Sequence, residues 1–174
     1  NRVDDFAMTP QQNIAHASTT FMAQNRGAGN IRRMKRGFLC SVFLELVYTA
    51  AVFAVVFVFA KPIMQLFVDD GSEEVIGLGV SYLKLIAFMY VMPAATNTIQ
   101  GFFRGIGDLK VTLISTVLNM SARFLAAWLM IHIMHGGFDR LAWANFFGWV
   151  AMLALQIPLF TIHWRKEKAA KPDA

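Results

Sequence analysis

Apolar residues are gathered into four long stretches, and polar residues lie between them. The apolar stretches cover residues 37–60, 75–100, 111–134 and 141–163. A bilayer core of about 30 Å is crossed by roughly 20 helical residues at a rise of 1.5 Å each. Each stretch is long enough, so the pattern predicts an all-α integral membrane protein built as a helical bundle.

The segment before them, residues 5–25, is more polar and carries glutamine, asparagine, histidine, serine and threonine side chains. Hydropathy alone does not predict that it spans. A helix buried among other helices and an interfacial helix both fit its composition. If it also crosses, the chain has about five transmembrane helices in a lobe over residues 1–163, followed by a cytoplasmic tail over residues 164–174.

Short connections follow from turn and breaker residues. We expect Lys61-Pro62 to end the helix over residues 37–60, because proline cannot continue it. The segment 101–110 is predicted to be a loop, and the tail is expected to fray. Further turns with helix caps are predicted at Asp69-Asp70-Gly71 with Ser72, and at Gly136-Gly137 with Asp139.

The positive charges indicate an orientation. Eleven lysines and arginines fall on the side that holds the 26–36 loop, Arg104, Lys110 and the tail, against three on the opposite side. The excess of Lys and Arg marks the cytoplasmic side. We therefore expect a multi-pass protein of the inner (plasma) membrane with a cytoplasmic C-terminus. The charges sit at helix ends, which argues against a nucleic-acid partner.

Composition agrees with a membrane protein. The 174 residues are 56% hydrophobic and only 16% charged, whereas soluble domains carry about 25% charged residues. The single cysteine excludes an intrachain disulfide, and the four histidines share no metal-ligand spacing. No nucleophile elbow, P-loop or dinucleotide fingerprint is present. We expect neither an enzyme nor a bound cofactor or metal.

Polar residues recur along one face of each apolar stretch at helical spacing. This pattern predicts a bundle around a partly polar interior, because polar side chains in lipid face protein or water. The alternative is that such residues only hydrogen-bond neighbouring helices, at about 0.6 kcal/mol each. The candidates for a transport path are Arg123, Asn119, Glu45, Thr96, Asn97, Gln100, Asn145 and Gln156.

Two of these candidates are ionisable. Arg123 lies near the middle of its span, where a cation costs at least about 2.5–3.5 kcal/mol, so it needs a partner or water. Its role is either in the transport pathway and its switching or in structural pairing. Glu45 lies eight residues beyond Gly37. It is either a coupling or pairing acid or a structural acid that snorkels to the interface.

Two loops resemble signatures of the multidrug and toxic compound extrusion (MATE) transporters. The first resembles a "QN-x-GAG-x-x-x-R" loop and the second a "G-x-x-RG-x-GD" loop, with two spans between them. Arg123, halfway along the next helix, favours the C-terminal lobe of that family. The loop residues that carry the resemblance are Gln24, Asn25, Gly27, Ala28, Gly29 and Arg33, then Arg104, Gly105, Gly107 and Asp108.

The resemblance implies a two-lobed transporter whose central cleft opens to alternate sides of the membrane. It assigns residues 5–25 to a spanning helix of the C-terminal lobe and implies that the N-terminal lobe is a missing partner. Family members export organic cations, typically amphipathic drugs and toxins, in exchange for Na⁺ or H⁺. The span 75–100 contains no Asp or Glu, so the coupling site stays open. A lipid-linked oligosaccharide flippase lobe and a non-transporting membrane fragment are the alternatives.

Overall fold

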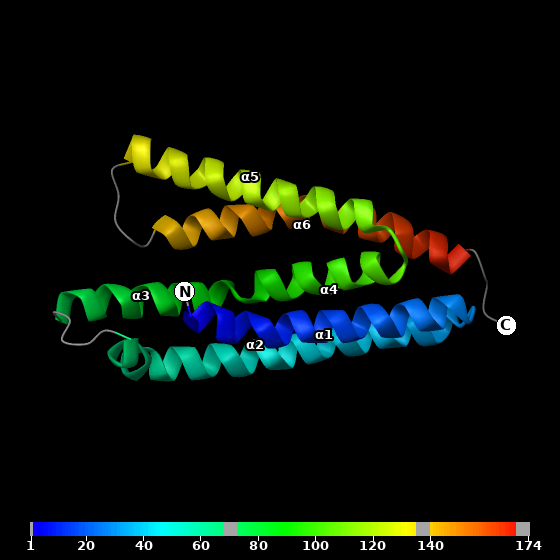
Figure 1. Cartoon of the computed structure of the whole chain (residues 1–174), viewed down its shortest axis with the longest axis horizontal. Coiled ribbons are helices and arrows are strands. Elements are labelled where there is room, and N and C mark those ends of the chain that lie inside the picture. The colour runs from blue at the N-terminus through cyan, green and yellow to red at the C-terminus, as the bar shows by residue number, and fades with distance from the viewer. Residues whose placement is uncertain (1, 68–72, 135–139, 170–174) are drawn as a thin grey trace.

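The computed structural model describes residues 2–67, 73–134 and 140–169, and within these ranges the chain forms six helices (Figure 1). They are α1 (Arg2–Gly27), α2 (Ile31–Phe67), α3 (Glu73–Met89), α4 (Val91–Gly105), α5 (Leu109–Met134) and α6 (Arg140–Ala169). The predicted all-helical membrane fold is confirmed. Four helical stretches have the length and apolar composition needed to cross a membrane, and α1 is not among them.

The helices run lengthwise beside one another (Figure 1). α5 packs along α6, and α3 with α4 forms a nearly continuous rod through the middle of the bundle. α1 packs against both α2 and α4, and α2 also packs against α3. The chain therefore forms one bundle in which α4 contacts α1, α2, α5 and α6.

The expected end of α2 at Lys61-Pro62 is wrong, because the helix continues to Phe67. Proline removes the hydrogen bond to the carbonyl four residues earlier and crowds it. The backbone absorbs this at Phe59, whose φ of −101° and ψ of 16° are not helical. The last turns of α2 bend away from the rest (Figure 1). A kink is favoured over an end because lipid offers no other partner to backbone groups.

The stretch predicted as one helix over 75–100 is two helices, α3 and α4, separated at Tyr90. Pro93 has no N–H, so the carbonyl of Met89 loses its usual partner. The chain tightens instead: Tyr90 N–H donates to the Ala87 carbonyl at 3.2 Å, and Ala94 N–H donates to the Tyr90 carbonyl at 3.3 Å. The helix thus restarts in nearly the same direction.

Other predicted boundaries also change. The segment 101–110 is mostly helical: α4 runs to Gly105 and α5 begins at Leu109. The tail that was expected to fray is helical to Ala169. The predicted turns and caps at Asp69-Asp70-Gly71 with Ser72, and at Gly136-Gly137 with Asp139, lie outside the described residues.

The polar segment near the N-terminus forms α1 and lies against α4 through two glycines. A Cβ at Gly101 would lie 3.0 Å from the Ala15 carbonyl oxygen, and one at Gly105 would lie 2.8 Å from Met22 Cβ. Small residues four apart let two helix backbones approach closely in membranes. Thr19 Oγ1 donates to the Gly101 carbonyl at 3.2 Å across this contact. Protein packing therefore holds α1 in place.

Candidate functional site

The two loops singled out in the sequence share one backbone construction. Gly29 and Gly107 both have positive φ, 71° and 81°, a conformation that favours glycine. Asn30 N–H donates to the Asn25 carbonyl at 2.8 Å, and Asp108 N–H donates to the Phe103 carbonyl at 2.9 Å. Each glycine N–H also donates to the carbonyl three residues earlier, Gly29 to Arg26 and Gly107 to Arg104, and the two bonds together make each helix end a Schellman motif. The loops turn sharply without leaving helix carbonyls unpaired.

Arg26 connects these two loops and α6. Its Nη1 donates to the Ile106 carbonyl at 2.6 Å, and its Nη2 lies 2.9 Å from Glu167 Oε1 on α6. Three segments far apart in the sequence are thereby joined at one end of the bundle. Arg26 occupies a variable position in the loop signature and was not among the predicted site residues. The sequence shows its charge but not its partners, because they lie 80 and 141 residues away along the chain.

Arg104 and Asp108, both in the second loop, have separate partners. Arg104 Nε donates to the Gln100 carbonyl at 3.3 Å, within α4. Asp108 Oδ2 lies 3.5 Å from His163 Nε2 on α6. The second loop is therefore attached to α6 twice, through Asp108 and, by way of Ile106, through Arg26.

The remaining signature residues of the first loop lie at its surface or within its turn. Asn25 is buried and donates to the Phe21 carbonyl at 2.7 Å. Gln24 and Ala28 are exposed, and a Cβ at Gly27 would contact nothing. The guanidinium of Arg33 lies 5.6 Å from the centre of the Phe21 ring. Of this set, Asn25 and Gly29 shape the turn, while Arg33 extends toward the surface.

An aromatic cluster lies beneath the loops. The rings of Phe38, Phe102, Phe160 and Trp164 pack together with centroid distances of 4.9–5.8 Å. Phe102 is fully buried, and Phe38 is 7% exposed. Aromatic pairs at such distances contribute about 0.5–1.5 kcal/mol beyond their burial. The cluster joins α2, α4 and α6 below the polar contacts of Arg26.

Several predicted path residues are engaged in contacts between or within helices. Gln100 Nε2 donates to Thr116 Oγ1 at 3.2 Å, which joins α4 and α5. Gln156 Nε2 donates to Ser115 Oγ at 3.1 Å, which joins α5 and α6. Thr96 is buried and donates to the carbonyl of Pro93 in its own helix. These hydrogen bonds show that part of the polar interior stabilises the helices and the contacts between them.

The three predicted asparagines differ in burial. Asn119 is 9% exposed, and its Nδ2 has no partner in the described part of the chain. Asn97 and Asn145 are half-buried on α4 and α6. These asparagines therefore add polar groups near the bundle interior to those that form the hydrogen bonds described above.

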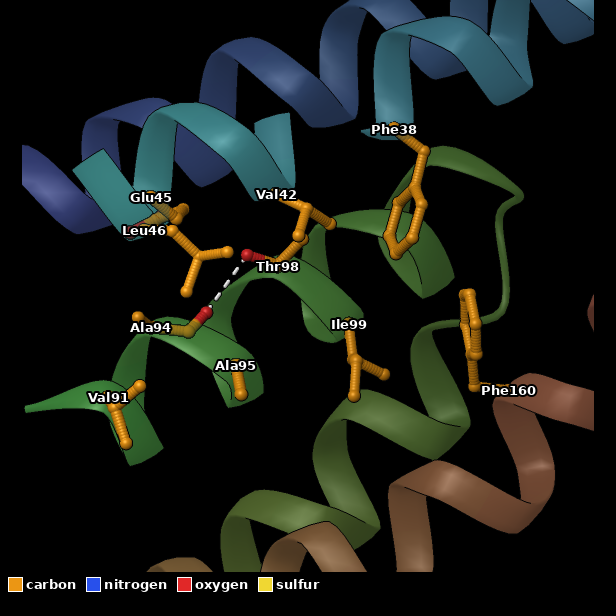
Figure 2. A pocket seen from close by; sticks show the side chains of 10 residues that line it. All are labelled: Phe38, Val42, Glu45, Leu46, Val91, Ala94, Ala95, Thr98, Ile99 and Phe160. Atoms are coloured by element: carbon orange, nitrogen blue, oxygen red, sulfur yellow. Dashed lines mark hydrogen bonds between the residues drawn. The ribbon is translucent and has the colours of Figure 1, made fainter. Parts of the chain in front are cut away.

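Glu45 lies in a pocket between α2 and α4, shown in Figure 2. The pocket has a volume of about 260 Å³ and ends at the rings of Phe38 and Phe160. Its other lining residues are Val42, Leu46, Val91, Ala94, Ala95, Thr98 and Ile99. The Thr98 hydroxyl is committed to the Ala94 carbonyl at 2.9 Å. Glu45 is the only ionisable residue among those that line the pocket.

The carboxylate of Glu45 is isolated. The residue is 2% exposed, so the snorkelling alternative is wrong. Neither carboxylate oxygen has a hydrogen-bond partner in the described ranges, so the pairing alternative finds no partner there. A buried ionised carboxylate without a partner is costly, and the cost is removed when it takes up a proton or another cation. The arrangement is chemically suited to reversible cation binding.

Arg123 has a different setting on α5. Its side chain is exposed, and its aliphatic part covers Gly148 of α6, where a Cβ would clash with Arg123 Cγ. The structural-pairing alternative finds no acidic partner in the described part of the chain. Arg123 and Glu45 are therefore not brought together: one lies on the α5–α6 seam and the other between α2 and α4.

The exposed face of α1 is polar along most of its length. Its members recur at helical spacing and are Gln12, Asn13, His16, Thr20 and Gln24. The opposite side of the helix is buried against α2 and α4. Lipid does not solvate such groups, so a polar face at this depth meets water or protein.

Apolar spans, a polar helix packed among them and an isolated buried acid define a membrane protein of the transporter class. Residues 1–129 match the family described as MatE. The chain belongs to the MatE family, and the expected membership is confirmed.

Two known proteins show the extent of the likeness. A probable multidrug resistance protein NorM of Thermotoga maritima is 24% identical over 153 residues, which cover 87% of this chain and 31% of that protein. A solved structure described as the inward-facing conformation of a multidrug resistance MATE family transporter of the MOP superfamily matches with a TM-score of 0.86. It is 18% identical, and the match covers 97% of this chain and 39% of that one. The chain thus spans a minor part of each relative's length.

Proposed function

We propose that this chain is the C-terminal lobe of a secondary transporter that exports cationic amphipathic compounds in exchange for Na⁺ or H⁺. The lobe sits in the inner (plasma) membrane with its C-terminus in the cytoplasm, and an N-terminal lobe completes the cleft. Membership of the MatE family supports the transporter class, and two relatives carry multidrug resistance in their descriptions. The distribution of lysine and arginine supports the orientation.

The observation that carries the exchange mechanism is the isolation of Glu45. Glu45 lines an apolar pocket in which no other lining residue is charged, and its buried carboxylate oxygens have no hydrogen-bond partner among the described residues. A proton, Na⁺ and an organic cation would each neutralise the carboxylate. If they compete for this one site, release of one accompanies binding of another, which is the chemical requirement for antiport. The span 75–100 carries no acid of its own, and Glu45 faces α4 from the neighbouring helix.

The polar face of α1 supports a position beside the cleft, because these side chains favour water. Of the five residues that form this face (Gln12, Asn13, His16, Thr20 and Gln24), only His16 is ionisable, and the exposed Arg26 lies beyond it at the loop end of the helix. A lipid-linked oligosaccharide flippase would favour several cations there to meet a pyrophosphate. The uncharged face therefore favours a cationic cargo.

The cytoplasmic loops would hold the helix ends together while the lobe moves. Arg26 ties the first loop to the second loop and to α6, and the aromatic cluster packs directly below. Alternating access proceeds largely by rigid-body motion of one half against the other. A lobe whose helix ends are cross-linked in this way is suited to moving as a unit.

The test uses the complete transporter in proteoliposomes, with tetraphenylphosphonium as the organic cation. We expect an imposed pH or Na⁺ gradient to drive its exchange. Glu45→Gln removes the charge while keeping the side-chain size, and we expect at least a tenfold loss of gradient-driven exchange. Glu45→Asp should retain part of it. The matched control is Gln156→Leu. It removes a buried amide and its hydrogen bond to Ser115 but removes no charge.

Two failures are distinguishable in this experiment. Absence of exchange in the unaltered transporter under both gradients, together with lipid-linked sugar flipping, contradicts the antiport proposal. Full exchange by Glu45→Gln in a working transporter contradicts only the role of Glu45. Thermal unfolding of both proteins separates a loss of function from a loss of folding. Glutamine keeps the size of the side chain and carries no charge, so we expect Glu45→Gln to be no less stable than the unaltered protein.

A further inference from the structure

A groove runs along the seam between α1 and α2, on a different side of α2 from the Glu45 pocket. Its volume is about 490 Å³, and its walls are mostly apolar, including Ile14, Ala17 and Phe21 on α1 and Leu44 on α2. Arg33 and Arg36 line the same groove near the start of α2. The groove therefore combines a short cationic end with a longer apolar part.

The cationic end is built from packed residues. The Phe21 ring lies across Gly37, where a Cβ would clash with two ring carbons. Arg33 lies over that ring at 5.6 Å from its centre. The backbone N–H of Arg33 donates to Asn30 Oδ1 at 3.0 Å. Asn30 thereby caps the start of α2 and fixes the backbone there. Glycine thus makes room for an aromatic platform that positions one of the two guanidinium groups.

An unused hydroxyl lies deeper in the same groove. Ser18 is 4% exposed, and its Oγ has no partner in the described residues. It lies one turn from Phe21, about 4.5 Å along the helix axis at 1.5 Å for each residue. Ser18 lines the groove, and its hydroxyl is a donor that no acceptor in the described residues has taken up. The order from the helix end inward is two cations, a hydroxyl donor and an apolar wall.

We propose that this groove binds an anionic phospholipid of the cytoplasmic leaflet. Its phosphate would lie between Arg33 and Arg36, an ester carbonyl would reach Ser18, and an acyl chain would lie along Ala17 and Leu44. Basic pockets between membrane helices on the cytoplasmic side bind anionic headgroups. Guanidinium groups suit phosphate because their donors match its oxygens in pairs. The proposal uses the orientation proposed above but does not depend on the cargo or on the exchange reaction.

The test measures lipid binding to the complete purified protein by native mass spectrometry. The probes are phosphatidylglycerol and phosphatidylcholine with identical acyl chains. We expect preferential retention of phosphatidylglycerol at one site. Arg33→Gln with Arg36→Gln should weaken that binding about 25-fold, since each arginine near anionic lipid contributes about fivefold. Arg36→Gln alone should weaken phosphatidylglycerol binding about fivefold. Because Arg36 lies outside the loop signature, this single variant serves as the test if Arg33 proves necessary for folding.

The matched control removes two charges elsewhere at the same end of the bundle. Arg165 and Lys166 are exposed on α6 and do not line the groove, so their double substitution by glutamine should change binding less than twofold. Ala17→Phe fills the apolar part and keeps both arginines, and it should lower retention at least fivefold. Equal binding of the two lipids, or an equal loss in the α6 control, would overturn the proposal in favour of diffuse charge attraction.

An independent readout is the reactivity of Cys40, which is exposed and lines the groove. In nanodiscs that contain phosphatidylglycerol, alkylation of the Cys40 peptide should slow at least threefold relative to phosphatidylcholine alone. The Arg33→Gln, Arg36→Gln variant should abolish this difference. Unchanged reactivity in both lipids for the unaltered protein would contradict occupancy of the groove.

Discussion

α1 and α2 pack side by side in the bundle, yet the faces that they turn outward differ. α2 exposes large apolar side chains such as Leu39, Phe43 and Val47. α1 exposes Gln12 and Asn13 on its outward face. Their shared interface is polar in part, since Gln11 Nε2 donates to Thr49 Oγ1 at 3.0 Å. The contrast lies on the outside, where α2 has a surface suited to lipid and α1 has one suited to water or protein.

The difference shows how a polar helix is kept within a membrane bundle. α2 has enough apolar surface to favour the bilayer unaided. α1 is held by close backbone contact with α4 at Gly101 and Gly105, and by Arg26 at its end. Its position therefore depends on neighbours, and its polar face remains available for the proposed cleft.

The largest expected effect comes from placing a cation on each outward face at matched depth. The bond from Gln11 to Thr49 aligns the two antiparallel helices, so Asn13 and Val47 lie at about the same level. Val47→Arg puts the charge toward lipid and should cost about 2.5–3.5 kcal/mol, or roughly a hundredfold in the equilibrium constant between inserted, folded protein and its alternatives. Asn13→Arg should cost less than about 1 kcal/mol. Membrane-inserted, protease-resistant protein measures both, and equal losses would contradict the contrast.

The second effect tests whether close packing holds α1. Gly105→Ala would place a Cβ 2.8 Å from Met22 Cβ, and overpacking of this kind costs about 1–3 kcal/mol. The control is Gly77→Ala on α3, where a Cβ would contact nothing. Replacing a helical glycine there should stabilise the protein by about 0.5–1 kcal/mol. Thermal unfolding in detergent gives both signs, and a neutral Gly105→Ala would show that α1 is held by other contacts.

The smallest effect concerns the end of α1. Arg26→Gln removes the ion pair with Glu167 and weakens the bond to the Ile106 carbonyl. Arg26 is 43% exposed at its side chain, and exposed pairs contribute at most about 1 kcal/mol. We expect a loss near that value, with Glu167→Gln coupled to it in a double-mutant cycle. Arg32→Gln, an exposed arginine of the same loop region, should have no measurable effect on unfolding.

The sequence predicted the apolar spans well and several boundaries poorly, and the reasons differ. Apolar length is a local property, so the membrane class follows from it directly. The end of a helix depends on competing partners for the backbone, and α2 continues past Pro62 because lipid supplies none. Pro93 is likewise accommodated by a one-residue break at Tyr90 within the span Val75–Gly105.

The candidate site was predictable in part. The resemblance singled out Gly29 and Gly107 as loop residues, and the structure supplies the physical reason, since both take a positive φ that favours glycine. Arg26 was missed, since its role depends on Ile106 and Glu167, which are remote in the chain. Helical spacing grouped Gln156 with polar residues, but its bond to Ser115 required the packing of α6 on α5.

By itself the sequence determined the all-helical membrane class, the apolar spans and the uneven distribution of lysine and arginine along the chain. These features depend on local composition and on backbone sterics, which act within a few residues. Tertiary structure alone decided that α1 packs as a polar helix, that Glu45 is buried with no partner among the described residues, and that Arg33 and Arg36 lie beside a groove. Each of these depends on which helix faces overlap, and helical periodicity gives a face without naming its neighbour.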